Sequence, residues 1–332
     1  MDAAVQEQLK RIPKVDAILE QEIIREWAQV HPHDAVVDQI RAALENLRQS
    51  ILDGSVEPGS DYVKAVVIKV CAHFRRLALR SLRPVVNATG IVVHTNLGRA
   101  PLSAEVMSGQ IRAMGYSNLE FDLESGKRGS RYVHVEGLLR QLTGAEAAIV
   151  VNNNAAAVML AVNSLADNSE IIISRGELVE IGGSFRIPDV ITRSGGKLVE
   201  VGTTNKTRLD DYESAITENT AAVLKVHRSS FQICALRTPV PRQEHVGRQR
   251  ARGLMVIEDL GSGTLVDLTH YGLPREDTVQ EVIAAGVDLV TFSGDKVLGG
   301  PQAGIICGTR PAIDRLKKNP LLRALRITTP AL

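Results

Sequence analysis

The feature that most constrains the fold is an alternation of short apolar runs with helical stretches, which begins near residue 145. Such runs, at residues 148–151, 171–174, 198–201, 223–226, 255–257, 289–292 and 304–307, have the length of buried strands. Helical stretches such as 155–165 and 279–285 lie between most of them. This pattern predicts an α/β domain with a mostly parallel sheet covered by helices on both faces. Ligands bind such sheets at the carboxyl ends of the strands, so we expect the chemistry in the loops that follow them.

The composition excludes several classes of protein. The chain has 332 residues, 44% hydrophobic and 23% charged, which suits one large α/β domain with a smaller appendage. Aromatic residues make up 3% and the net charge is +1, which argues against a general nucleic-acid binder. The distant cysteines Cys71, Cys234 and Cys307 indicate neither disulfides nor a zinc site, and favour a cytoplasmic location. No apolar run approaches the roughly 18 residues of a membrane span and no signal peptide is evident, so we expect no membrane association.

The N-terminal part has a different organisation. The pattern of residues 1–60 predicts a small all-α domain, with helices near 15–19, 23–30 and 35–52. Residues 61–83 are predicted to form a basic helical linker, whose helix starts at Tyr62 and ends near residue 82. Residues 1–63 hold six basic and twelve acidic side chains, whereas residues 64–83 hold six basic and no acidic ones. The basic helix fits either a solvated surface or a contact with a phosphate backbone.

One lysine follows a predicted strand directly. Lys296 stands in the run Ser293-Gly294-Asp295-Lys296, ahead of a glycine pair. A lysine on a glycine-lined loop can be desolvated, lose part of its basicity and lie against a planar cofactor. The position therefore fits the Schiff-base lysine of a pyridoxal 5′-phosphate (PLP) enzyme, and the alternative is a solvated loop lysine.

Other strand ends carry groups that a PLP site needs. Asn152, Asn153 and Asn154 open a helix, and its backbone N–H groups suit the cofactor's phosphate, although asparagine there is also a common helix cap. Ser293 either donates its hydroxyl to the phosphate or only ends a strand.

Two further loops complete the expected cofactor site. Asp259 lies 37 residues before Lys296 and suits the partner of the pyridinium nitrogen, or else is a helix cap or a loop charge. Thr203 and Thr204 follow another strand and can donate to the phosphate or to the substrate.

Several long motifs resemble bacterial selenocysteine synthases, the L-seryl-tRNA(Sec) selenium transferase family. They occupy residues 82–103, 144–146, 151–158, 174–189 and 293–296 in the family's order. The resemblance covers roughly residues 82–327, and more loosely the N-terminal helices.

The resemblance implies a fold and an assembly. The fold would be that of fold type I, aspartate aminotransferase-like PLP-dependent transferases, with residues 84–327 as the PLP-binding core domain. Lys296 would form the aldimine with the cofactor, and residues 1–60 would hold the tRNA. The family also implies a ring-shaped, decamer-like homo-oligomer built from dimers, with active sites at the dimer interfaces.

The implied reaction converts L-seryl-tRNA(Sec) to L-selenocysteinyl-tRNA(Sec) for selenoprotein biosynthesis. It passes through a PLP aldimine and an aminoacrylyl-tRNA intermediate, and selenophosphate supplies the selenium. Lys296 would act as the base for the α-proton, and Asp295 would assist proton transfer or orient the loop.

Selenophosphate is a small anion, which fixed guanidinium groups bind at two points. The resemblance assigns this role to Arg99, Arg131, Arg323 and Arg326, and leaves open whether Arg128 takes the place of Arg131. Surface solvation is the alternative for each of these side chains.

The chain departs from the family at two places. Residues 328–332 do not match, and the family's small C-terminal domain is absent, which suggests a truncated chain. In residues 226–231, threonine and asparagine are expected around the serine, and this chain instead has Arg228 there. Two alternative functions therefore remain: a PLP-dependent lyase of a small amino or sugar acid, and an inactive, truncated tRNA-binding or assembly protein.

Overall fold

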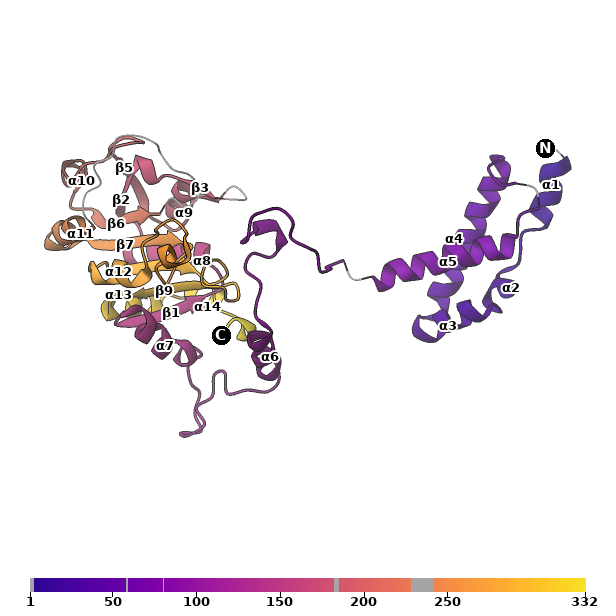
Figure 1. Ribbon diagram of the computed structural model, residues 1–332, viewed down its shortest axis with the longest axis horizontal. Coiled ribbons are helices and arrows are strands. Elements are labelled where there is room, and N and C mark those ends of the chain that lie inside the picture. Colours follow the sequence, from indigo (N-terminus) through magenta and orange to yellow (C-terminus); the bar gives the residue numbers. More distant parts are fainter. Residues whose placement is uncertain (1–2, 58, 80, 182–184, 228–241) are drawn as a thin grey trace. The chain divides into compact units, whose positions relative to one another are not determined.

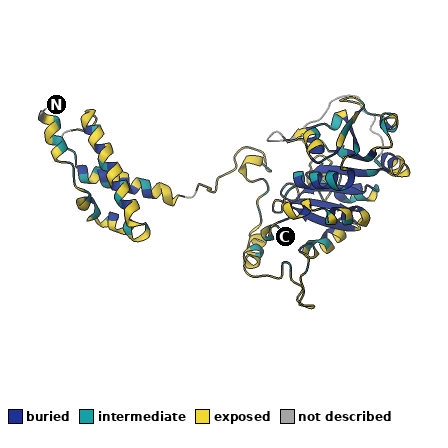
Figure 2. Ribbon diagram, turned by 180° about the vertical axis from the view of Figure 1, so that it is seen from behind, coloured by how far each residue is buried: buried dark blue, intermediate teal, exposed yellow. Residues whose placement is uncertain are grey.

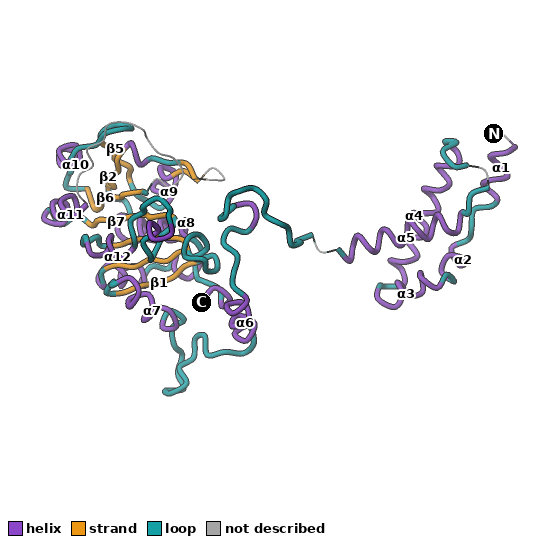
Figure 3. The backbone as a smooth tube through the Cα atoms, in the orientation of Figure 1, coloured by secondary structure: helices purple, strands orange, loops and turns teal. Residues whose placement is uncertain are grey.

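The computed structural model describes residues 3–57, 59–79, 81–181, 185–227 and 242–332, so Cys234 and Arg228 lie outside the described residues. The chain divides into two compact units, Met1–Val86 and Asn87–Leu332. The first unit is helical and the second holds a sheet with helices around it (Figures 1 and 3).

The first unit packs its helices around one apolar cluster. Its helices are α1 (Ala3–Lys10), α2 (Val15–Leu19), α3 (Glu22–Val30), α4 (His33–Leu52) and α5 (Tyr62–Ala78). The buried residues of α4 follow one another at intervals of three and four: Val36, Ile40, Ala43, Leu47 and Ile51. This interval places them on one stripe of the helix, which faces α5 and the shorter helices.

Helix α5 begins where the sequence predicts and ends four residues early. Asp61 caps its start by accepting from the backbone N–H of Lys64, at 3.0 Å. After Phe74 the helix has no buried side chain, and Leu77 and Leu79 are exposed. Without packing to hold further turns, the backbone becomes extended at Leu79.

The main sheet of the second unit contains all the strands that the sequence predicts. Within the described residues it has seven strands: β1 (Ala147–Val151), β2 (Glu170–Ser174), β5 (Lys197–Val201), β6 (Thr220–Val226), β7 (Met255–Gly261), β8 (Leu289–Ser293) and β9 (Gly304–Gly308). Their spatial order is β1-β9-β8-β7-β6-β2-β5. A separate antiparallel pair joins β3 (Glu180–Ile181) to β4 (Phe185–Arg186).

One strand runs against the others. β9 is antiparallel to both β1 and β8, whereas the pairs from β8 to β5 are parallel. Residues 294–303 join β8 to β9 without a helix, and a parallel connection needs a crossover of about a dozen residues or more. The chain therefore turns back at the carboxyl end of β8, and this turn carries Lys296.

Helices cover both faces of the sheet, as the apolar strands predict. One face packs against α8 (Asn154–Ala166), α9 (Ile187–Arg193), α13 (Arg310–Lys318) and α14 (Leu321–Ala324). The other packs against α7 (Val133–Thr143), α11 (Arg242–Ala251) and α12 (Val279–Ala284). Buried residues concentrate on the strands between these layers (Figure 2).

The remaining elements belong to neither the main sheet nor the helices named above. They are α6 (Ala104–Ala113), α10 (Leu209–Ala215) and short 3-10 turns at Thr95–Leu97, Arg175–Glu177, Leu268–Tyr271 and Thr329–Ala331. Among the described residues, no helix combines the length and the apolar character needed to cross a membrane.

Candidate active site

The loop that carries Lys296 is held closed by its own backbone. Gly294 exchanges hydrogen bonds with two parts of the loop: its N–H donates to Ala303 at 2.8 Å, and its carbonyl accepts from Gly300 at 2.8 Å. A Cβ at Gly294 would lie 2.8 Å from the carbonyl oxygen of Pro301, so glycine is required for this close approach. The loop thus holds the half-buried Lys296 at the carboxyl end of β8.

Burial lowers the pKa of Lys296 below its ordinary value, and the nearby Arg99 guanidinium lowers it further. Asp259 and Asp295 act in the opposite direction. The amine is therefore easier to deprotonate than an exposed lysine, as a nucleophile or a base requires.

Asp259 lies on the neighbouring strand and is almost completely buried. Three donors converge on its Oδ1 atom: Asn154 Nδ2 at 2.8 Å, the Gly261 N–H at 2.9 Å and Thr291 Oγ1 at 3.2 Å. No hydrogen-bond donor of the described residues contacts Oδ2. Burial raises the pKa of Asp259, while these donors and Lys296 favour the carboxylate. The arrangement leaves one oxygen available to a cationic N–H group, as a pyridinium presents.

The three asparagines after β1 have different environments. Asn153 caps α8, since its side chain accepts from the Ala156 N–H at 2.9 Å. The Asn154 side chain turns to Asp259, and the Asn152 N–H donates to the carbonyl of Leu325 at 3.0 Å. The first N–H groups of α8 have no acceptor within the helix, so the helix start retains donors for a phosphate group.

The hydroxyl residues predicted for the site do not all lie near Lys296. Ser293 is buried at the end of β8, directly before the lysine loop. Thr203 and Thr204 follow β5, an edge strand four positions from β8 in the sheet. At about 4.8 Å per strand this corresponds to roughly 19 Å, so the chain does not bring these threonines to its own lysine. Thr203 instead closes its turn by donating to the carbonyl of Lys206, at 2.9 Å.

Arg99 is joined to the lysine loop. Its Nη1 donates to Asp295 Oδ2 at 2.6 Å, and the next N–H, of Ala100, donates to the Asp295 carbonyl at 3.2 Å. Arg99 has a φ of +63°, an uncommon backbone conformation for a residue with a side chain. Asp295 is buried, and its Oδ1 has no partner among the described residues. Asp295 borders a pocket of about 380 Å³, which is also lined by Gly98 and Ala100 on either side of Arg99 in the sequence.

The other predicted arginines form a second group. Arg131, Arg323 and Arg326 line a pocket of about 400 Å³ together with Arg128 and Glu120. Arg131 is buried and Arg128 is exposed, and both donate to Glu120. The Arg326 segment meets the end of β1, because Val151 pairs with Arg326 in an isolated bridge. The second group thus lies at the same edge of the sheet as the asparagine turn.

Sequence reasoning missed Thr291 and Glu120. Thr291 is the register partner of Asp259 on β8, a relation that requires knowledge of the strand pairing. Glu120 lies in a stretch without secondary-structure pattern, and only its position in the long family-like region could have drawn attention to it.

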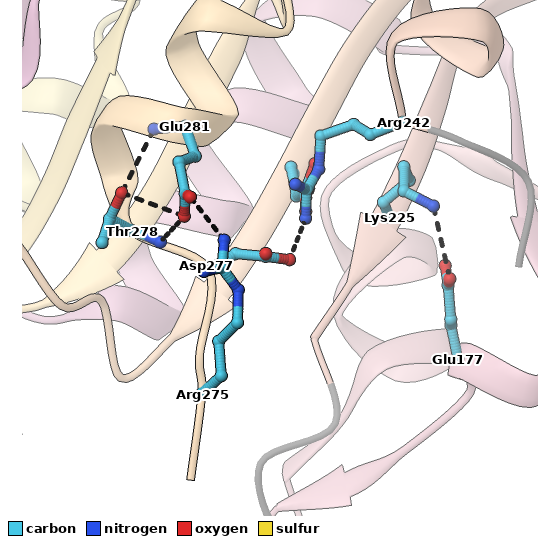
Figure 4. A network of polar contacts seen from close by, with 8 residues as sticks. Glu177, Lys225, Arg242, Arg275, Asp277, Thr278 and Glu281 are labelled. Atoms are coloured by element: carbon cyan, nitrogen blue, oxygen red, sulfur yellow. Dashed lines mark hydrogen bonds and ion pairs between the residues drawn. The ribbon is translucent and has the colours of Figure 1, made fainter. Parts of the chain in front are cut away.

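A further polar network supports the strand that carries Asp259. Glu258 accepts two hydrogen bonds from Arg242 Nε and one from its Nη2, at 2.9–3.2 Å, and Arg242 also donates to Asp277 at 2.6 Å. Figure 4 shows Arg242 reaching Asp277, with Lys225 and Glu177 paired nearby. Adjacent residues of a strand face opposite sides, so Arg242 anchors β7 from the side opposite Asp259.

Two family models match the chain. One, described as L-seryl-tRNA selenium transferase, matches residues 85–332, and the other, described as selenocysteine synthase N terminal, matches residues 9–48. A protein of Geobacter sulfurreducens named L-seryl-tRNA(Sec) selenium transferase is 55% identical over 318 residues, covering 96% of this chain and 69% of that protein. One of the same name from Carboxydothermus hydrogenoformans is 51% identical over 328 residues, covering 98% of this chain and 70% of that protein.

Solved structures show the same fold. A D-glucosaminate-6-phosphate ammonia-lyase aligns with a TM-score of 0.61 at 24% identity, over 78% of this chain and 67% of that one. An aspartate aminotransferase of Thermus thermophilus aligns with a TM-score of 0.51 at 16% identity, over 84% of this chain and 69% of that one. The predicted aspartate aminotransferase-like fold of PLP-dependent enzymes is therefore confirmed. With the matches over both of its units, the chain belongs to the L-seryl-tRNA(Sec) selenium transferase family.

Proposed function

We propose that this chain is a PLP-dependent transferase that converts L-seryl-tRNA(Sec) to L-selenocysteinyl-tRNA(Sec) with selenophosphate as the selenium donor. The observation that carries the proposal is that Lys296 and Asp259 come from the neighbouring strands β8 and β7 near the carboxyl edge of the sheet. Asp259 keeps one oxygen free there, and Lys296 has a lowered pKa. Family membership supports the substrate.

The residues present fit the cofactor. PLP supplies a carbonyl that condenses with amines and a protonated ring that withdraws electrons from the substrate. In the proposal, Asp259 would hold the ring nitrogen through its free oxygen, and the first N–H groups of α8 with the Ser293 hydroxyl would hold the phosphate. Lys296 holds the cofactor and then takes the α-proton of the bound serine. Asp295 holds Arg99 beside the amine.

The donor site uses the arginines. Guanidinium groups bind a tetrahedral anion through paired N–H donors, and selenophosphate is such an anion. We assign Arg99 to the lysine side of the site and Arg131, Arg323 and Arg326 to the second pocket, with the buried Arg131 preferred to the exposed Arg128.

The first unit is proposed to bind the tRNA. On α5, the side chains of Lys64, Lys69, Arg75 and Arg76 are exposed, and no acidic partner among the described residues pairs with them. Free cations on one helix suit the phosphate backbone of RNA. The match of residues 9–48 to the family's N-terminal model favours this function over a small-molecule lyase, which needs no such unit.

The assembly is proposed to be a cytoplasmic homo-oligomer, a ring built from dimers. Large apolar side chains are exposed on α6 and the segment after it, among them Ile111, Met114 and Leu123, at 71%, 68% and 74% of their surface. Apolar surface of this kind usually marks a contact with another chain. The described cysteines, Cys71 and Cys307, are free thiols, in keeping with a reducing cytoplasm.

The test combines a spectrum with a binding measurement. PLP-loaded protein is expected to show visible absorption that Lys296→Ala abolishes and Lys197→Ala, an exposed lysine on the edge strand, retains. Seryl-tRNA(Sec) is expected to bind more tightly than seryl-tRNA(Ser) at the same salt concentration. Colourless wild-type protein would refute the enzyme, and equal weak binding of both tRNAs would refute this substrate.

A further inference from the structure

The second pocket, which the predicted arginines line, contains the carboxylate of Glu120, and this carboxylate is already hydrogen-bonded to three of its arginines. Glu120 Oε1 accepts from Arg131 Nε at 2.9 Å, from Arg131 Nη2 at 2.7 Å and from Arg326 Nη1 at 3.1 Å. Glu120 Oε2 accepts from Arg128 Nη2 at 3.0 Å. One side chain thus binds three guanidinium groups in the way that a bound oxyanion would.

The pocket remains strongly positive in spite of Glu120. Six cationic side chains line it against this one carboxylate: Arg128, Arg131, Lys317, Lys318, Arg323 and Arg326. Lys317 is paired with Glu136, at 3.0 Å. The side chains of Lys318 and Arg323 have no hydrogen-bond or ion-pair partner among the described residues. A second anionic charge would therefore be attracted, beyond the single charge that Glu120 provides.

Arg131 explains why a counter-ion is present. Its side chain is only 10% exposed, and a buried guanidinium without a partner is strongly destabilising. Glu120 supplies the partner from the base of an exposed hairpin, where Gly129 N–H donates to the Glu120 carbonyl at 2.9 Å. Residues 121–128 around the hairpin tip are exposed, so the Glu120 side chain can turn to solvent without unpacking the core.

We propose that Glu120 is the internal counter-ion of this anion site and sets the charge that a tetrahedral oxyanion needs in order to displace it, so that doubly charged anions bind appreciably and singly charged ones bind only weakly. A singly charged anion that displaces Glu120 exchanges one charge for one charge and gains no net attraction. A dianion that displaces Glu120 brings one negative charge more than Glu120 did, and the same guanidinium groups attract this additional charge. The inference rests on the proposed function, in which these arginines bind the selenium donor.

The selection has a specific purpose at a site that acts on tRNA. Each phosphodiester of an RNA backbone carries one negative charge, whereas a phosphate monoester or free phosphate approaches two at neutral pH. Glu120 therefore keeps the backbone of the tRNA substrate out of the donor pocket and leaves the pocket open to the small dianion.

The test compares two probes by calorimetry on PLP-loaded protein, in which the cofactor's own phosphate site is filled. Wild-type protein is expected to bind inorganic phosphate more tightly than dimethyl phosphate, a singly charged diester. Glu120→Gln removes the competing charge for both probes, so both are expected to bind more tightly, on the order of tenfold, and dimethyl phosphate is expected to bind measurably. Glu124→Gln, on the same hairpin but outside the arginine cluster, is expected to keep the wild-type affinities for both probes. Arg326→Gln is expected to weaken the binding of phosphate.

Other results would overturn the proposal. A folded Glu120→Gln protein with unchanged affinities for both probes, or with weaker phosphate binding, would make Glu120 a purely structural partner of Arg131. Phosphate binding unaffected by Arg326→Gln would place the anion elsewhere. A measurement on the unaltered chain is independent of how the variants fold: chloride should compete poorly with phosphate, and strong competition would refute the selection. None of these results depends on the PLP spectrum or on tRNA binding.

Discussion

The hydrogen bond from Thr291 to Asp259 offers the sharpest test of how the cofactor site is held. Thr291 is completely buried, and its Oγ1 lies 3.2 Å from Asp259 Oδ1. Thr291→Val keeps the shape of the side chain and removes the donor. A hydrogen bond to a charged group contributes about 1.5–3 kcal/mol. Because 3.2 Å is long for such a bond and Oδ1 keeps two other donors, we expect a loss near the lower limit, about 1.5 kcal/mol.

The destabilisation by Thr291→Val should depend on pH, and the pKa of Asp259 determines in which direction. Burial raises the pKa of Asp259 in the folded protein, so this group makes folding less favourable as pH rises from the ordinary carboxyl value through the raised one. Removal of a donor raises that pKa further. The cost of Thr291→Val should therefore be larger on the alkaline side of the Asp259 titration, where the carboxylate is ionised, than on its acid side, where the protonated carboxyl loses only a neutral hydrogen bond.

The assay uses the two units of the chain. The single tryptophan, Trp27, belongs to the first unit, so its fluorescence reports unfolding there, while far-UV circular dichroism also follows the second. In urea, Thr291→Val should shift only the transition of the second unit, and the dissociation constant of PLP should rise by up to about tenfold. Thr143→Val, a buried threonine that donates to the neutral carbonyl of Leu139, should leave PLP binding unchanged. Unchanged stability and PLP affinity in Thr291→Val would refute the role of the bond.

Two further predictions concern backbone packing and a buried histidine. In Gly304→Ala the added Cβ would lie 2.0 Å from the carbonyl oxygen of Asn153. We therefore expect the free energy of unfolding in urea to fall by about 3 kcal/mol or more, and PLP to bind more weakly. Gly137→Ala on α7 has open space around the added Cβ and should be neutral or slightly stabilising. Burial lowers the pKa of His245 to about 3, with Lys225 as a smaller cause, so its contribution to stability is lost as pH falls from about 6.5 toward 3. His245→Phe should flatten the acid side of the stability curve by up to about 1.4 kcal/mol per pH unit, and an unchanged slope would contradict the assignment.

The strands and the positions of Lys296 and Asp259 could be predicted from the sequence because they depend on local patterns. Apolar runs of strand length form buried strands wherever the chain can cover both faces. The carboxyl ends of parallel strands share one edge, so residues that follow different strands are expected there together. The placement of Asp259 and Lys296 at the same edge follows from that rule without knowledge of the strand order.

Other features depend on contacts between distant segments. The Asn154 side chain contacts Asp259 across 105 residues of sequence, and Glu120 contacts Arg326 across 206. The distance of Thr203 from Lys296 follows from the strand order, in which β5 takes the edge position. A local pattern contains no information on any of these.

The sequence by itself determined the kind of chemistry: a lysine and a carboxylate at strand ends, in motifs of one enzyme family. Only the tertiary structure decided which oxygen of Asp259 is free, which asparagine caps α8 and that one glutamate occupies three arginines. The physical reason is that hydrogen-bond geometry acts over about 3 Å, and strand order and register determine which atoms come that close.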